Sequence, residues 1–162
     1  MARHVRTLAL ACLALVGNAW GASGPTPGPI ARYFIDGKFD DVKDDVALAI
    51  QNRGLVIDHV SHVHAMLERT GKDLGTPQPI FREAQVFSFC SAVVSRRMLE
   101  ANPHDIALCP YAISVYVLHN EPKRVYVAFR RPGAGEPPVA HGRLQEVEAL
   151  LDGIVREALG LP

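Results

Sequence analysis

The sequence has no excess of charge of either sign and no long apolar run. Among its 162 residues, 17 are Lys or Arg and 17 are Asp or Glu, so the formal net charge at pH 7 is zero. Such a balance provides no broad basic surface, and we expect no nucleic-acid partner. The apolar runs are shorter than the ~20 residues that a membrane-spanning helix needs, so we also expect no membrane span. Apolar residues at 48% and charged residues at 21% are typical of a single globular domain.

Several motifs that would identify an enzyme are absent as well. The sequence contains no HExxH, no CxxC and no CxxCH haem-attachment motif. Gly133 and Gly135 precede a proline pair instead of a helix, which excludes a phosphate-binding loop there. The acidic residues at 40–45 cluster where a helix is expected to begin, which is typical of a solvated surface. These absences favour a protein that is not an enzyme.

The first residues have the order of a secretory signal peptide. Arg3 and Arg6 precede an apolar run at 8–16, and the small-x-small pattern Ala19-Trp20-Gly21 follows it. We predict that residues 1–21 are removed near Gly21 and that the protein is periplasmic or secreted. Residues 22–34 are expected to form a flexible Pro- and Gly-rich lead-in and a first strand, and residues 35–160 a single domain.

Removal of the signal peptide changes the cysteine count. Cys12 is lost with it, and Cys90 and Cys109 remain. An even number of cysteines in an exported chain fits an oxidising compartment.

Hydrophobic periodicity predicts alternating strands and helices. The expected elements are strands at 31–35, 55–63, 85–89, 112–118 and 125–130, helices at 39–53, 91–101 and 144–158, and a short helical stretch at 64–69. The strands at 112–118 and 125–130 are separated by a short turn and read as an antiparallel hairpin. The fold class is therefore α+β, a mostly antiparallel sheet with helices on one face.

Four short motifs give this chain a resemblance to a known family. They are Phe39-Asp40-Asp41-Val42, the segment 52–57, the segment 86–92 around Cys90, and the segment 108–116 around Cys109. Together they resemble domain-of-unknown-function family 302 over roughly residues 35–159. Many members have Asn-Pro after the first cysteine position and a Pro-Cys order at the second, whereas this chain has Ser91-Ala92 and Cys109-Pro110. It therefore resembles an exported two-cysteine branch, and the resemblance implies a TATA-binding-protein-like fold without an established activity.

The densest group of metal-binding side chains is the histidine cluster at 59–64. On a strand, His62 and His64 would share one face about 6.6–6.8 Å apart, while His59 would point the other way. With Cys90 and Cys109 these histidines would form a mixed nitrogen and sulfur ligand set that suits copper or zinc. The alternative is that the histidines are partly exposed side chains at the end of a strand and hold no ion.

The two cysteines have three alternative fates: a disulfide, metal ligands or separate buried thiols. If the strands that carry Cys90 and Cys109 were parallel, these residues would lie at opposite ends, whereas antiparallel strands would bring them within the Cα separation of about 4.4–6.8 Å that a disulfide requires. The apolar neighbours of Cys90 predict a thiol that is at least half buried. Its place just before a helix would lower its pKa.

Three classes of function follow from these observations. The first is a non-enzymatic module that binds a small ligand or a periplasmic protein through its sheet face or the loop at 71–80. The second is a metal-binding or thiol-redox accessory protein that uses Cys90, Cys109 and the histidines of 59–64. The third is a hydrolase or transferase with Cys90 as its nucleophile. The pair Arg130-Arg131 is interpreted as surface charge.

Overall fold

The computed structural model describes residues 24–135 and 138–162. The predicted signal peptide, with Cys12 and the cleavage position, lies outside the described residues. The chain ahead of the first strand is described from Gly24 onward.

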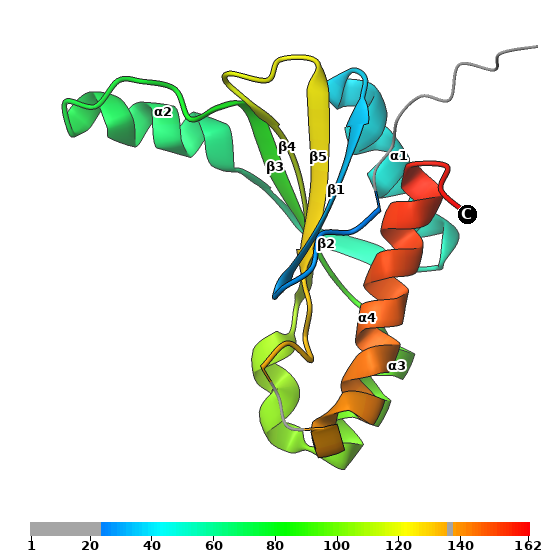
Figure 1. The fold of residues 1–162 in the computed structure, drawn as a ribbon. Coiled ribbons are helices and arrows are strands. Elements are labelled where there is room, and N and C mark those ends of the chain that lie inside the picture. The colour runs from blue at the N-terminus through cyan, green and yellow to red at the C-terminus, as the bar shows by residue number, and fades with distance from the viewer. Residues whose placement is uncertain (1–23, 136–137) are drawn as a thin grey trace, which may run out of the picture.

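A five-stranded antiparallel sheet forms the centre of the molecule (Figure 1). Its strands are β1 (Ile30–Asp36), β2 (Val56–His62), β3 (Phe81–Cys90), β4 (Tyr111–Leu118) and β5 (Arg124–Arg130). They lie in the order β1-β5-β4-β3-β2, and every neighbouring pair is antiparallel. The first strand, β1, thus lies at one edge of the sheet next to the last strand, β5. The expected α+β fold with an antiparallel sheet is confirmed.

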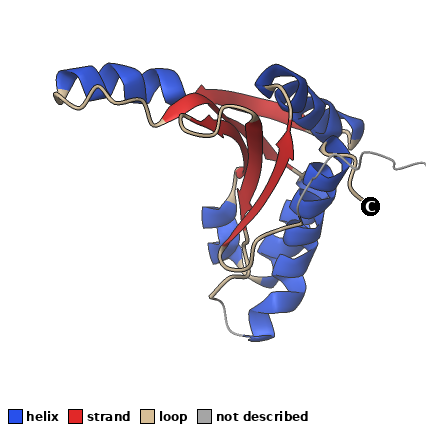
Figure 2. Cartoon of the chain, turned by 45° about the horizontal axis from the view of Figure 1, so that its top comes forward, coloured by secondary structure: helices blue, strands red, loops and turns tan. Residues whose placement is uncertain are grey.

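Helical segments flank this sheet. They are α1 (Phe39–Asn52), α2 (Val63–Asp73), α3 (Ala92–Ala101) and α4 (Pro138–Ala158), with a 3₁₀ helix η1 (Pro103–Leu108) between α3 and β4. Of these, α1 and α4 cover one face of the sheet. The long helix α4 contacts α1, α3 and β5, whereas α2 contacts β3 and projects beyond the sheet (Figures 1 and 2). None of the helices described for this chain is long and apolar enough to cross a membrane.

The core lies between the sheet and the helices α1 and α4. Alternate residues of β4 and β5 point toward it because side chains on a strand change face at every step. The fully buried members include Ile113, Val115, Val125, Val127, Val46, Ile50, Val147 and Ile154. On the helices, the buried residues of α1 recur at the three- and four-residue spacing that the sequence predicts for an amphipathic helix.

Helix α1 ends at a glycine, as expected. Gly54 has a φ of 70°, which favours glycine, and its N–H donates to the carbonyl of Gln51 over 2.8 Å. This turn leads directly into β2.

Two helix boundaries differ from the sequence prediction. Helix α4 begins at Pro138, whereas the sequence predicts a start at Leu144 because residues 138–143 carry no regular apolar stripe. Proline is favourable at the first helical position, which it occupies here. Helix α2 begins at Val63, directly after the last paired residue of β2, and runs to Asp73. The segment 103–108, for which no element was predicted, forms η1.

Candidate functional site

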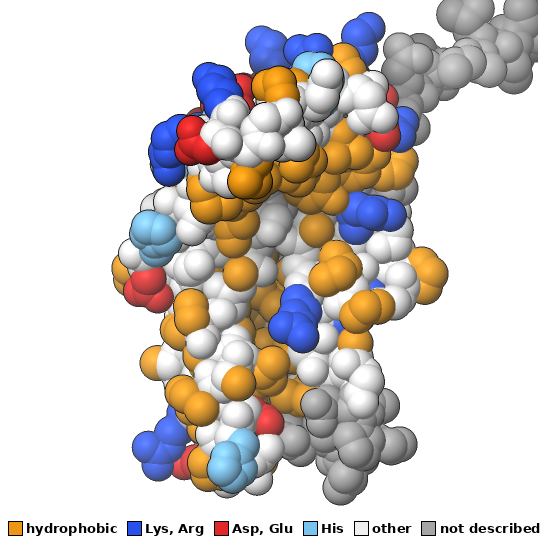
Figure 3. Space-filling view, turned by 90° about the vertical axis from the view of Figure 1, so that its left-hand side faces the viewer, with side chains coloured by type: hydrophobic (Ala, Val, Ile, Leu, Met, Phe, Trp, Pro, Cys, Tyr) orange, Lys and Arg blue, Asp and Glu red, His pale blue; other side chains and the backbone are white. Residues whose placement is uncertain are grey.

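The sheet face turned away from α1 and α4, here called the outer face, is hollowed. Ala112 and Ser114 of β4 and Ala128 of β5 lie on it, because each alternates with core residues of its strand. Figure 3 shows this side of the molecule, with hydrophobic side chains around a hollow beneath α2 and basic side chains among them. Small side chains at the centre of the sheet leave room for a bound molecule.

A cavity of about 330 Å³ lies at the end of this hollow that adjoins η1. Its walls come from β1, β4, β5, η1, the segments next to them and α4. The lining residues are Ile30, Ala107, Leu108, Pro110, Tyr111, Ala112, Ser114, Ala128, Phe129, Arg130, Pro132 and Leu151. Apolar side chains predominate, and Arg130 is the one charged residue among them.

The side chain of Arg130 is exposed. Its backbone pairs with Ile30 at the end of the sheet. Within residues 24–135 and 138–162, no hydrogen bond or ion pair engages this side chain. The cavity therefore has a cation on its wall without a counter-charge from the described lining residues.

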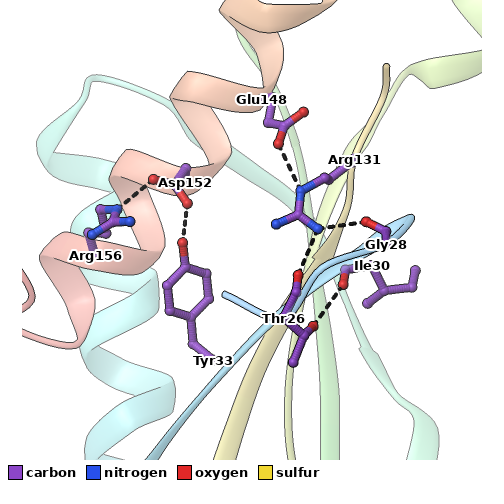
Figure 4. Close-up of polar contacts among 8 residues, drawn as sticks. All are labelled: Thr26, Gly28, Ile30, Tyr33, Arg131, Glu148, Asp152 and Arg156. Atoms are coloured by element: carbon purple, nitrogen blue, oxygen red, sulfur yellow. Dashed lines mark hydrogen bonds and ion pairs between the residues drawn. The ribbon is translucent and has the colours of Figure 1, made fainter. Parts of the chain in front are cut away.

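The neighbouring Arg131 has a different environment, and its interpretation as surface charge is wrong. Its Nε donates to Glu148 of α4 over 2.9 Å, and its Nη1 donates to the carbonyls of Thr26 and Gly28 over 2.9 and 2.6 Å (Figure 4). The Thr26 hydroxyl in turn donates to the carbonyl of Ile30. Arg131 thus fastens the lead-in before β1 to α4, so this part of the segment expected to be flexible is held in place.

A second polar contact in the same region ties β1 to α4. The hydroxyl of Tyr33 donates to Asp152, and Arg156 donates to the other oxygen of that carboxylate over 2.6 Å (Figure 4). Burial, followed by the bond to Asp152, raises the pKa of Tyr33. This group is structural and is turned away from the outer face.

The far end of the outer face is aromatic. Tyr116 of β4 and Tyr126 of β5 stack with their ring centroids 5.2 Å apart. Burial raises the pKa of Tyr116, while a hydrogen bond and the charge of Arg32 act in the opposite direction. Arg32 lies opposite Ala128 in the β1–β5 ladder and is engaged with this tyrosine.

The two cysteines lie together at one end of the β3–β4 ladder. Phe89 pairs with Tyr111, so Cys90 directly follows the last residue of β3 that pairs with β4, and Cys109 comes shortly before β4. Both cysteines are free in this structure, and Cys109 is one of the groups that raise the pKa of Cys90. The strands β3 and β4 are therefore antiparallel, which is the condition under which the sequence predicts that the two cysteines lie close together. The disulfide itself stays a prediction.

A short hydrogen-bonded chain extends from Cys109 into the protein. The thiol of Cys109 donates to the Ser95 hydroxyl of α3 over 3.7 Å, and the Ser95 and Tyr111 hydroxyls are 3.0 Å apart. Ser91 caps α3 by accepting from the backbone N–H of Val94 over 3.3 Å. Helix α3 is thereby held against the cysteine pair.

Two expectations about Cys90 are wrong. Its side chain is exposed and not half buried, because strand alternation places it on the opposite face from Phe89. Its pKa is raised, whereas the sequence predicts that the following helix lowers it. Partial burial of the sulfur is the main cause, followed by the charge and hydrogen bond of Cys109 and the charge of Asp58. The backbone N–H of Tyr111 opposes this shift. A thiol with a raised pKa does not favour a nucleophilic hydrolase.

The structure does not bring the histidines to the cysteines. His62 ends β2 opposite Gln85, whereas Val56 at the other end of that strand pairs with Cys90. The expectation that His62 and His64 share a strand face is wrong because the helix begins at Val63.

His64 makes contacts of its own within the fold. Its Nδ1 accepts from the backbone N–H of Ala84 over 3.3 Å, and its Nε2 lies 3.3 Å from a carboxylate oxygen of Glu83. In the described part of the chain, no three His, Cys, Asp or Glu side chains are grouped so as to hold a metal ion. Copper or zinc binding stays a prediction, with only the thiol pair assembled.

The loop at 71–80 contributes a second, smaller cavity. It has a volume of about 150 Å³ and lies between this loop and α2, with His64 and Glu68 on its wall. The cavity at η1 is larger and holds Arg130.

Sequence reasoning missed Arg130, Ser95 and the hydroxyl of Tyr111. Alternation from the buried Val127 and Phe129 places Arg130 on the outer face, so strand periodicity contained the signal for it. The contact between Ser95 and Tyr111 joins a helix to a strand and has no local sequence signature.

Comparisons with known proteins address the family and the fold. The family described as "Domain of unknown function DUF302" matches residues 33–158. The fold is similar to the crystal structure of an uncharacterized conserved DUF302 protein from Bacillus stearothermophilus, with a TM-score of 0.62 and 14% sequence identity. That similarity covers 78% of this chain and 97% of the other, and it concerns the fold alone. A search of curated proteins finds no match. Since the family match extends over most of the sequence, this chain belongs to the DUF302 family.

Proposed function

We propose that this protein is an exported binding module for a small molecule with an apolar body and an acidic group. The ligand would occupy the cavity at η1, with its acidic group on the guanidinium of Arg130. The observation that carries the proposal is the exposed Arg130, without a partner among the described residues, on the wall of a predominantly apolar cavity. Binding sites for small molecules commonly combine an apolar lining with a few polar groups that orient the ligand.

The volume of the cavity limits the size of the ligand. A space of about 330 Å³ is at the lower end of the range for small-molecule sites, about 300–1,000 Å³. A short aliphatic or aromatic acid fits this space, whereas a dinucleotide or a folded peptide does not. Apolar groups such as Leu108, Ala128 and Phe129 would contact the body of the acid.

The charge of the cavity favours an anion. Arg130 lines it, and the described residues of the lining include no Asp or Glu. A guanidinium binds a carboxylate through two parallel hydrogen bonds, which fixes the orientation of the ligand as well as its charge. The hydroxyl of Ser114 supplies a further polar group on the same wall.

A nuclear magnetic resonance titration with hexanoate and phenylacetate tests this proposal, with the uncharged hexanamide as the matched control ligand. We expect saturable shifts of the backbone amide signals of Ala112, Ser114 and Ala128 with both acids and weaker binding of the amide. Arg130→Gln should lower the affinity for hexanoate about tenfold or more, because a hydrogen bond to a charged group contributes about 1.5–3 kcal/mol.

Arg96→Gln is the matched control variant. Arg96 is an exposed arginine of α3 that pairs with Glu100, and it does not line the cavity. Its replacement should leave the affinity unchanged. Equal binding of hexanoate and hexanamide, or an unchanged affinity in Arg130→Gln, would contradict the proposal.

A further inference from the structure

We propose that Cys90 and Cys109 form a thiol–disulfide exchange site, in which Cys90 reacts with an external disulfide and Cys109 resolves the intermediate. This inference is independent of the ligand cavity. It rests on the strand pairing that brings the two cysteines to one end of the β3–β4 ladder, on their unequal exposure and on the polar groups that hold Cys109.

The strand pairing brings the two sulfur atoms to one place. β3 and β4 are antiparallel and paired up to Phe89 and Tyr111, so the end of β3 lies beside the start of β4. Cys90 and Cys109 flank this last pair, and both are free cysteines. An intramolecular disulfide therefore joins groups that the fold has already assembled, which is the condition that disulfide geometry imposes.

The two thiols differ in access to solvent. Cys90 is exposed at the edge of the protein, where a sulfur atom of another molecule can reach it. Cys109 is less exposed, packs against the core, and donates to Ser95, which contacts the hydroxyl of Tyr111. This difference assigns the attacking role to Cys90 and the resolving role to Cys109.

The reaction with a small-molecule disulfide proceeds in two exchanges. The Cys90 thiol loses its proton to solvent, and its sulfur attacks one sulfur of the external disulfide, whose S–S bond breaks and releases one thiolate that takes up a proton. The Cys109 thiol then loses its proton and attacks the Cys90 sulfur, which breaks the mixed disulfide and releases the second thiol. The two cysteines are oxidised to one disulfide, the external disulfide is reduced to two thiols, and an excess of thiol reverses both steps.

The groups around Cys90 and Cys109 affect whether the disulfide or the dithiol form is favoured. Strongly oxidising disulfides belong to sites that stabilise the thiolate of the reduced form. Here burial, Cys109 and Asp58 all disfavour the thiolate of Cys90, and only the backbone N–H of Tyr111 favours it. We therefore expect a disulfide that persists in a mixed glutathione buffer and forms more quickly as the pH rises.

The experiment uses oxidised glutathione as the external disulfide. The chain carries Cys12→Ser, so that Cys90 and Cys109 are its only thiols, and it is fully reduced and freed of reductant before mixing. Mass spectrometry of the native protein should show a product lighter by two hydrogen atoms, without a stable glutathione adduct. Digestion should then yield the peptides of residues 90 and 109 joined by one disulfide.

Variants distinguish the two roles. Cys109→Ser should accumulate one glutathione adduct on Cys90, because the resolving thiol is gone. Cys90→Ser should acquire its adduct at least several-fold more slowly, because Cys109 is less exposed. Melting curves establish that both variants are folded, and Cys109→Ala provides a second test of the resolving role with a different side chain.

Three outcomes would overturn this proposal. The first is a separate glutathione adduct on each cysteine of the protein with both thiols. The second is that both thiols remain free after equilibration, as counted by thiol titration in denaturant. The third is a stoichiometric copper or zinc ion that the thiols retain and that prevents oxidation, which would assign the pair to metal binding.

Discussion

Substitutions of the adjacent residues Arg130 and Arg131 test which of the two arginines stabilises the fold. We expect Arg131→Ala to destabilise the fold and Arg130→Ala to leave its stability unchanged. The two substitutions remove the same side chain from consecutive positions, so composition and net charge change equally. Only the surroundings of the two guanidinium groups differ.

The expected size of the effect follows from the contacts of Arg131. Its side chain is 18% exposed and donates to Glu148 and to the carbonyls of Thr26 and Gly28. A hydrogen bond to a charged group contributes about 1.5–3 kcal/mol when its partner stays buried. Glu148 and the carbonyls regain water when Arg131 is lost, so we expect a total loss of about 2–3 kcal/mol. That is a large share of a typical domain stability of about 5–15 kcal/mol.

Urea denaturation followed by far-UV circular dichroism measures this loss. With a denaturant dependence of about 1–3 kcal/mol per molar urea, the midpoint of Arg131→Ala should fall by about 1 M or more. The midpoint of Arg130→Ala should coincide with that of the unsubstituted protein, since no described residue binds its guanidinium. Equal midpoints for the two variants would refute the reasoning, because the lead-in would then contribute nothing to the fold.

Three further predictions concern the core, the thiols and the N-terminus. Leu151→Asp places a carboxylate at a position that is 2% exposed, so it should destabilise the domain by about 3 kcal/mol or more, and a melting temperature near that of the unsubstituted protein would contradict this. Cys109→Ser removes a hydrogen bond and a charge that raise the pKa of Cys90, so the alkylation rate of Cys90 should reach its half-maximum at a lower pH than in the protein with both thiols; an unchanged pH profile would argue against their contact. N-terminal sequencing of protein from the native host should begin near Ala22, and an intact Met1 on the accumulated protein would exclude cleavage.

The strands and the long helices could be predicted because their apolar periodicities are strong. The buried residues of α1 and α4 recur at helical spacing, and β4 and β5 alternate around a short turn. The start of α2 could not be predicted in the same way. The segment from Leu55 to Val63 is rich in β-branched residues and half alternating, which suits a strand, but pairing with β3 ends at His62 and Val63 already belongs to the helix.

The candidate sites depend on contacts between segments that lie far apart in the sequence. The proximity of Cys90 and Cys109 could be stated only as a condition on strand direction, and the β3–β4 pairing meets that condition. The sequence predicts a half-buried Cys90 from its apolar neighbours, but Phe87 and Phe89 lie on the opposite face of the strand.

The contrasting environments of Arg130 and Arg131 arise at the point where β5 leaves the sheet. Ladder pairing with β1 ends at Arg130, whose side chain therefore keeps the outward direction of its strand. The backbone N–H of Arg131 still donates to the carbonyl of Pro29 over 2.9 Å, which places its side chain on the α4 side next to the lead-in. The carbonyls that bind it are more than a hundred residues earlier in the chain. One of two adjacent arginines thus ties the lead-in to α4, while the other stays exposed on the outer face, because a strand ends between them.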